Sequence, residues 1–132
     1  WGQGAFGALG TNSTQANGTP TTVSLPAAAV AVGAGRTATC AALTTGAVYC
    51  WGTDGGLLTG TGIPSGSARS TPGLVGQLPP MRTVTVGRNF ACGIRQSDNV
   101  VWCWGANGIA QLGGRGVSTG GVPGEVVRIP TA

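Results

Sequence analysis

The chain has 132 residues, a length that allows one domain with a modest core. It contains no His, no Lys and only three acids, so we expect neither an enzyme nor a bound cofactor. The net charge of +4 comes from seven Arg that are scattered singly, which argues against nucleic-acid binding. No stretch approaches the roughly twenty apolar residues of a membrane-spanning helix, so no membrane span is predicted.

Three sequence anchors recur along the chain at a fixed period. The dipeptide Trp-Gly begins at residues 1, 51 and 104, so its spacings are 50 and 53 residues. A Gly-rich loop follows each pair and carries a Leu near the same position, namely Leu9, Leu57 or Leu58, and Leu112. The other anchors are a Pro-bounded segment (Pro20–Pro26, Pro72–Pro79, Pro123–Pro130) and the motif V-x-x-G-R (Val32–Arg36, Val84–Arg88). Glycine that keeps step with Trp, Cys and Val indicates a repeat protein rather than a disordered chain. We expect one segment, 1–132, with repeats 1–50 and 51–103 and a partial repeat 104–132.

Short strands are predicted in each repeat. The first is the apolar run Pro26–Gly35, which is short and bracketed by Gly and Pro, so we expect a buried strand. Further β-branched runs bounded by turn residues predict strands at Val84–Val86 and Val100–Trp102. Four short strands in about fifty residues match one blade of a β-propeller. The predicted fold class is all-β, a partial β-propeller of four-stranded antiparallel blades.

The four cysteines form two pairs of similar spacing, Cys40 with Cys50 and Cys92 with Cys103. Set face to face across a hairpin, the first pair leaves the loop 44–46, with Gly46 where a left-handed residue is needed, and the second leaves the loop 96–99. Cross-strand neighbours lie within disulfide reach, so we predict the disulfides Cys40–Cys50 and Cys92–Cys103. Zinc sites usually have much shorter gaps between cysteines. Free buried thiols remain the alternative.

Two disulfides are typical of an oxidising compartment, so we predict a secreted or cell-surface protein. The polar segment 11–20 contains two N-x-[ST] sequons, at Asn12 and Asn17, which are predicted glycosylation sites in such a compartment. An ordinary solvated loop is the alternative for this segment.

Arg36 and Arg88 occupy the same repeat position, just after the Gly that ends a predicted strand. Repeated placement would set them on one face of adjacent blades, as a patch that contacts an anionic partner or a glycan. In the other interpretation, each guanidinium bonds carbonyls of the neighbouring blade. The tryptophans of the Trp-Gly pairs are expected to pack between blades rather than to form a ligand platform.

The run 35–52, G-R-x-x-x-C-A-x-L-x-x-G-x-V-Y-C-W-G, followed by a Gly-rich x-L-G loop, resembles the repeat of the regulator-of-chromosome-condensation family. The resemblance covers the whole chain. It implies blades of a closed propeller, typically of seven blades. The family often has a His shortly after the Gly of V-x-x-G, where this chain has Thr37–Thr39 and Asn89–Ala91.

About 2.6 repeats are too few to close a ring of the usual blade number. The chain starts at Trp1 without a signal peptide, so we expect a piece of a longer chain, or copies that associate into a larger ring or fibre. The expected function is a non-catalytic extracellular structural or interaction module whose partners are proteins, further copies or glycans. The resemblance implies the alternative, a protein-binding propeller that inhibits secreted enzymes or acts as an exchange factor for small GTPases.

Overall fold

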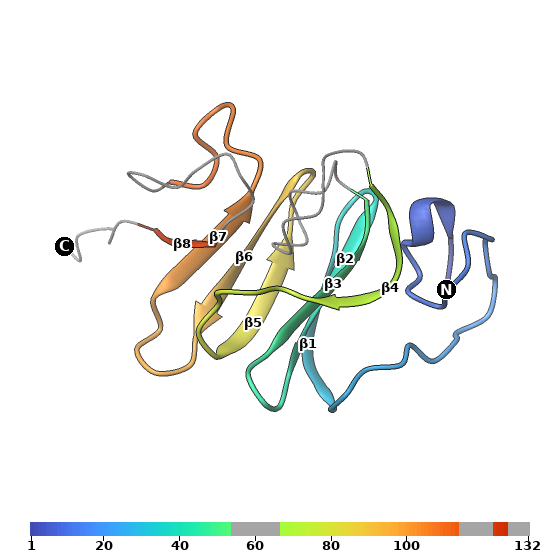
Figure 1. Ribbon diagram of the computed structural model, residues 1–132, viewed down its shortest axis with the longest axis horizontal. Coiled ribbons are helices and arrows are strands. Elements are labelled where there is room, and N and C mark those ends of the chain that lie inside the picture. Colours follow the sequence, from blue (N-terminus) through green and yellow to red (C-terminus); the bar gives the residue numbers. More distant parts are fainter. Residues whose placement is uncertain (54–66, 114–122, 127–132) are drawn as a thin grey trace.

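The computed structural model describes residues 1–53, 67–113 and 123–126. These residues form two antiparallel four-stranded sheets, in the order β1-β2-β3-β4 and β5-β6-β7-β8 (Figure 1). The strands of the first sheet are β1 (Ala29–Ala34), β2 (Ala38–Leu43), β3 (Val48–Gly52) and β4 (Arg69–Leu74). Those of the second sheet are β5 (Met81–Val86), β6 (Phe90–Arg95), β7 (Val101–Gly105) and β8 (Gly124–Glu125). A 3-10 turn, η1 (Ala5–Gly7), contacts β3 and β4. The all-β architecture of four-stranded antiparallel sheets is the expected one.

The two central hairpins have the predicted register and loops. Cys40 lies opposite Cys50 between β2 and β3, and Cys92 lies opposite Cys103 between β6 and β7. The first hairpin turns through 44–46, where Gly46 has a φ of 85° as the three-residue loop requires. The second turns through one more residue, 96–99. The longer turn absorbs the extra residue, so the two sheets stay in equivalent register.

The outermost strand of each sheet comes from the repeat after the one that supplies the other three strands. β4 follows the second Trp-Gly pair and contains Pro72, which an edge strand tolerates because its N–H side faces no neighbour. Pro123 directly precedes β8, which pairs with β7 in the same way. The sheets therefore straddle the boundaries 50/51 and 103/104 of the sequence repeats.

The Trp-Gly pairs mark the point where the chain leaves the third strand of a sheet. Their glycines, Gly2, Gly52 and Gly105, have φ values of 109°, 97° and 109°, a conformation that side chains rarely adopt. A Cβ at Gly105 would also lie 2.7 Å from the carbonyl oxygen of Asn89, so there is no room for one. The positive φ and the close approach of neighbouring backbone atoms together explain why glycine recurs at this position.

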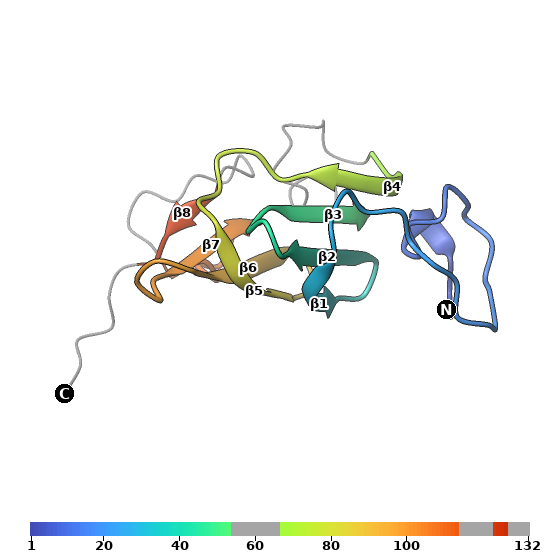
Figure 2. The same ribbon diagram turned by 90° about the horizontal axis from the view of Figure 1, so that it is seen from below.

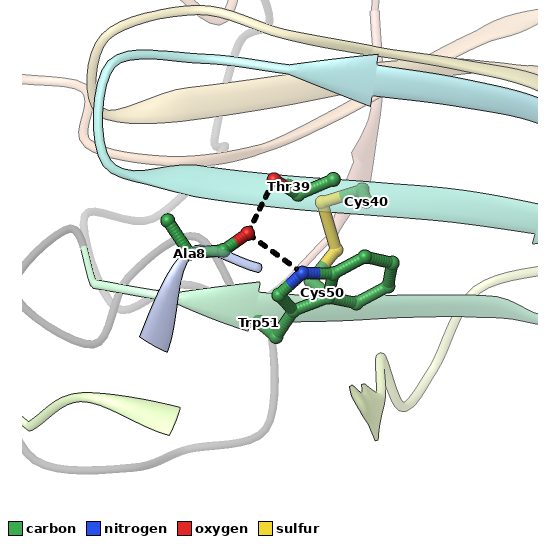
Figure 3. The surroundings of a disulfide bond; sticks show 5 residues. All are labelled: Ala8, Thr39, Cys40, Cys50 and Trp51. Carbon is green, nitrogen blue, oxygen red and sulfur yellow. Dashed lines mark hydrogen bonds between the residues drawn. A yellow bond between two sulfur atoms is a disulfide. The ribbon is translucent and has the colours of Figure 1, made fainter. Parts of the chain in front are cut away.

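Trp51, the tryptophan of the second pair, anchors the loop of the preceding repeat. The indole Nε1 of Trp51 donates to the carbonyl oxygen of Ala8 at 2.9 Å, and the hydroxyl of Thr39 donates to the same oxygen at 3.0 Å (Figure 3). Trp51 and Trp104 are buried, as expected for packing residues. Trp1 differs, being 76% exposed, because no strand of a preceding sheet lies beside it in the described structure.

Two of the predicted loop leucines can be placed. Leu112 is buried and Leu9 is half-buried, so both contribute to packing. Leu57 and Leu58, and Pro130 of the third Pro-bounded segment, lie outside the described residues.

The two sheets pack face to face, with β1 and β2 against β5 (Figure 2). Their shared core contains the buried residues Ala38, Cys40, Ala42, Val48, Cys50, Val75, Met81, Val84, Ala91 and Trp104. A second, smaller core lies on the other side of the first sheet, where Val23, Leu25 and Ala27 of the N-terminal segment cover three buried residues, Ala41, Leu43 and Trp51.

The N-terminal segment repeats the geometry of the outer part of a sheet. Gly2 and Asn17 exchange both backbone hydrogen bonds, at 2.6 and 2.9 Å. The equivalent pair in the first sheet is Gly52 with Arg69. The segment therefore carries the outer part of a preceding sheet without that sheet's inner strands.

One expectation from the sequence is wrong. The run Pro26–Gly35 does contain a strand, β1, but that strand is not buried: Val30 is 54% and Val32 is 68% exposed. The reason is that β1 is the innermost strand of the first sheet, and among the described residues no inner strands of a preceding sheet lie against its outward face.

Candidate functional site

Each sheet has a forward face, which carries the cysteine pair and points toward the following repeat. In the first sheet this face consists of Cys40, Ala42, Val48 and Cys50, all buried by the second sheet. The equivalent positions in the second sheet are Cys92, Ile94, Val101 and Cys103. There Val101 is 39% exposed, whereas its counterpart Val48 is 1% exposed. A shallow groove of about 220 Å³ runs over this open forward face, lined by Thr83, Thr85, Cys92, Gly93, Ile94 and Val101.

The rear faces, which point toward the preceding repeat, show the same contrast. Val84 of the second sheet is buried in the shared core and 6% exposed. Its repeat counterpart in the first sheet is Val32, which is 68% exposed. At both faces, equivalent valines are covered where a neighbouring sheet is present and open where it is not. The chain therefore has one open face at each end of a two-sheet stack.

The structure brings the tips that carry Arg36 and Arg88 together. Each Arg begins the tight turn after an innermost strand, β1 or β5. The glycines just before them touch: a Cβ at Gly35 would lie 2.5 Å from the carbonyl oxygen of Gly87. Both arginines are exposed, and within the described ranges neither guanidinium bonds a carbonyl of the neighbouring sheet. We call this pair the arginine rim.

A separate ion cluster was not anticipated from the sequence. Nε of Arg95 donates to Asp98 at 2.7 Å, and its guanidinium also lies 3.8 Å from Glu125 and 5.6 Å from the ring centre of Trp102. The hydrogen bond to Asp98 raises the pKa of Arg95 above its ordinary value. This cluster connects the 96–99 turn to β8. The buried Nε1 of Trp102 has no acceptor among the described residues.

The two predicted glycosylation sequons lie in different environments. Asn12 is exposed, and its Oδ1 accepts a hydrogen bond from the hydroxyl of Ser70 at 3.3 Å. Asn17 is half-buried: its Oδ1 accepts from the N–H and the hydroxyl of Thr19, and its Nδ2 donates to Thr21 at 2.6 Å. In Asn17, the side-chain nitrogen that would carry a glycan is therefore already engaged in a hydrogen bond to Thr21. Asn12 also borders a groove of about 480 Å³ lined with threonine and serine hydroxyls.

Both cysteine pairs lie at disulfide distance. The S–S distances are 2.13 Å for Cys40–Cys50 and 2.07 Å for Cys92–Cys103, and the Cα atoms are 4.1 Å apart in each pair. The two pairs differ in their surroundings, because the first is covered by the second sheet and the second lies on the open forward face.

Among the described residues, no group of three or more metal-binding side chains comes together. No helix in that part of the chain is long and apolar enough to cross a membrane.

Comparison with known proteins identifies the architecture. The family model of the regulator of chromosome condensation (RCC1) repeat matches residues 1–42. A chain of the crystal structure of Kap60 bound to yeast RCC1 (Prp20) matches 97% of this chain with a TM-score of 0.80 at 19% identity. The crystal structure of Prp20p from Saccharomyces cerevisiae matches 97% of this chain with a TM-score of 0.78 at 20% identity. Human WBSCR16 matches 94% with a TM-score of 0.75 at 21% identity.

The chain spans only about a third of the length of these structures, 32% to 33%. The resemblance to RCC1 repeats is thus confirmed, and so is the predicted fold class. The two sheets correspond to blades, and the described residues form a partial β-propeller with an open face at each end.

Proposed function

We propose that this chain is a non-catalytic, protein-binding segment of a propeller, and that its open forward face takes a further blade of the same repeat. One observation carries the proposal: Val48 is 1% exposed under a neighbouring blade, and Val101, at the equivalent position, is 39% exposed. A blade that covers Val101 needs a rear face like the one that covers Val48. In this chain that rear face consists of Met81, Val84, Ala91 and Trp104.

Either further chain or a second copy can supply the missing blade. Because the forward and rear faces are different surfaces, copies would join head to tail. Such an assembly forms a larger ring if the rotation closes and a fibre if it does not. Exposed apolar faces of this kind mark interaction sites in soluble proteins.

The comparisons support protein as the class of partner. Yeast RCC1 is bound to Kap60 in one of the similar structures, and Prp20p is described by its binding to Gsp1p and histones. For this chain we infer only that the partner is a protein, and not that it is one of those proteins. An exchange-factor role on a small GTPase is compatible with the same fold.

We further propose that the protein works outside the cell, secreted or at the cell surface, with glycan on Asn12. Two cysteine pairs at disulfide distance support an oxidising compartment. Intact mass of protein from its natural source tests this: reduction should add about 4 Da, two hydrogens for each disulfide. Enzymatic deglycosylation should remove sugar from Asn12 and not from Asn17. If neither mass changes, the protein belongs to a reducing compartment.

Sedimentation velocity over a range of concentrations tests blade completion. Val32→Glu places a charge on the open rear face, and Val101→Glu places one on the open forward face. We expect the unmodified chain to form head-to-tail oligomers and each variant alone to be a monomer. An equimolar mixture of the two variants should form a dimer, since each variant retains one intact face.

Gln15→Glu adds the same charge at an exposed residue that belongs to neither open face and to neither sequon, and it serves as the control. It should assemble like the unmodified chain. If the unmodified chain is a monomer at every concentration and binds no hydrophobic dye, the proposal is wrong.

A further inference from the structure

The arginine rim consists of two exposed arginines on neighbouring turns of adjacent blades. Contact between Gly35 and Gly87 fixes the spacing of the two turns, because a side chain at Gly35 would collide with the carbonyl oxygen of Gly87. Arg36 and Arg88 follow directly and are both exposed. The fold therefore brings the two arginine-bearing turns to one edge of adjacent blades, although 52 residues separate the arginines in the sequence.

The charge of this rim is not neutralised within the described part of the chain. The two acids described there, Asp98 and Glu125, both lie beside Arg95, at 2.7 and 3.8 Å. The positive net charge of the chain therefore comes from the other six arginines, Arg36 and Arg88 among them. Arginine forms bidentate hydrogen bonds with carboxylates, and two adjacent forks match two neighbouring acidic side chains.

We propose that the arginine rim binds an acidic segment of a protein partner, with one carboxylate on Arg36 and the next on Arg88. The proposal rests on the protein-binding function above and names the chemistry of the partner at this edge. Nucleic acid fits less well, because duplex binders neutralise many phosphates along a stripe and the rim offers two charges at one place.

Fluorescence anisotropy with a labelled hexaglutamate peptide tests the proposal, with a labelled DNA duplex measured beside it. The double variant Arg36→Gln/Arg88→Gln should weaken peptide binding at least tenfold. Arg36→Lys/Arg88→Lys keeps the charge but not the forks, so its affinity should fall between the two. A small number of ion contacts also predicts a shallow salt dependence.

Arg82→Gln is the matched control. Arg82 is exposed near the start of β5, and its four strand steps to Val86, at roughly 3.3 Å each, place it about 13 Å from the end of the strand that Arg88 follows. This variant removes one positive charge where the double variant removes two, and it should bind the peptide as the unmodified chain does. If Arg82→Gln and the double variant lose equal affinity for the peptide, binding depends on net charge alone and the proposal is overturned.

Two other outcomes also overturn it: no measurable peptide binding by the unmodified chain, or tighter binding of the DNA duplex at the same salt concentration. Neither outcome bears on the proposal that a further blade covers the open forward face, because the rim substitutions leave both open faces intact. Oligomer formation by the double variant, measured by sedimentation, separates a failure of the rim from a failure of the proposed function.

Discussion

Gly46 illustrates how one residue's backbone conformation is tied to the packing between blades. It ends the hairpin of the first blade at a φ of 85°, and its carbonyl oxygen accepts a hydrogen bond from Met81 N at 2.8 Å. A Cβ at Gly46 would lie 2.5 Å from the Cβ of Pro80. The turn is therefore fixed by the hairpin and by the start of the second blade together.

Gly46→Ala should lower the free energy of unfolding by about 2 kcal/mol, because left-handed strain and the contact with Pro80 add together. Urea denaturation followed by tryptophan fluorescence measures this. Gly76→Ala is the control: a Cβ there meets nothing within 4 Å, so its effect should be small. Equal effects of the two substitutions would contradict this account of the turn.

Trp51 shows a second use of a single side chain, which is to hold the loop of the preceding repeat. Trp51→Phe removes the indole donor, while Thr39 still donates to Ala8. We expect a loss of about 1 kcal/mol in the free energy of unfolding, typical of one hydrogen bond. Limited proteolysis should cut the N-terminal segment faster in this variant. An unchanged cleavage rate would show that the hydrogen bond does not hold the loop.

At the scale of the elements, each central hairpin is braced by one cysteine pair. Closing loops of 10 and 11 residues stabilises the folded chain by roughly 2–3 kcal/mol each on the chain-entropy model. Cys40→Ala/Cys50→Ala should cost more stability than Cys92→Ala/Cys103→Ala, because the first pair also fills the shared core. Denaturant midpoints of the two double variants measure the difference, and the reverse order would contradict it.

The hairpins were also the most predictable part of the fold. Once Cys40 faces Cys50, the strand alternation and the position of Gly46 leave one register, and this is the register observed. The ion cluster was not predictable, since it joins Arg95 to Glu125 through the order of strands in a sheet. Nothing in the sequence around either residue indicates that partner.

At the scale of the whole molecule, the position of a residue in the stack of blades decides its environment. The apolar pattern of β1 predicted burial, yet Val32 is exposed while Val84 is covered. The same local pattern therefore gives opposite burial, depending on a neighbour that lies outside the strand. The contact between the Arg36 and Arg88 turns likewise depends on how two blades pack, so the sequence suggested a shared face but not the spacing.

This position in the stack predicts an order of reduction for the cysteine pairs. Cys92–Cys103 lies on the open forward face and Cys40–Cys50 beneath the second blade, so limited reduction and alkylation should label Cys92 and Cys103 first. Mass spectrometry of the peptides measures the order. Raising the protein concentration should slow the labelling if copies cover that face. Faster labelling of Cys40 and Cys50 would contradict the described packing.

The offset between sequence repeats and blades has a consequence for how such a chain can grow. The outer strand of each sheet comes from the next repeat, so one duplicated repeat unit does not contain all four strands of a blade. A duplicated repeat instead supplies the outer strand of the preceding blade and the three inner strands of the next blade. Each added blade is therefore joined to its neighbour by a shared repeat, as the existing blades are. Lengthening by whole repeats therefore keeps one open rear face and one open forward face, and the number of blades can change while the contacts between blades stay the same.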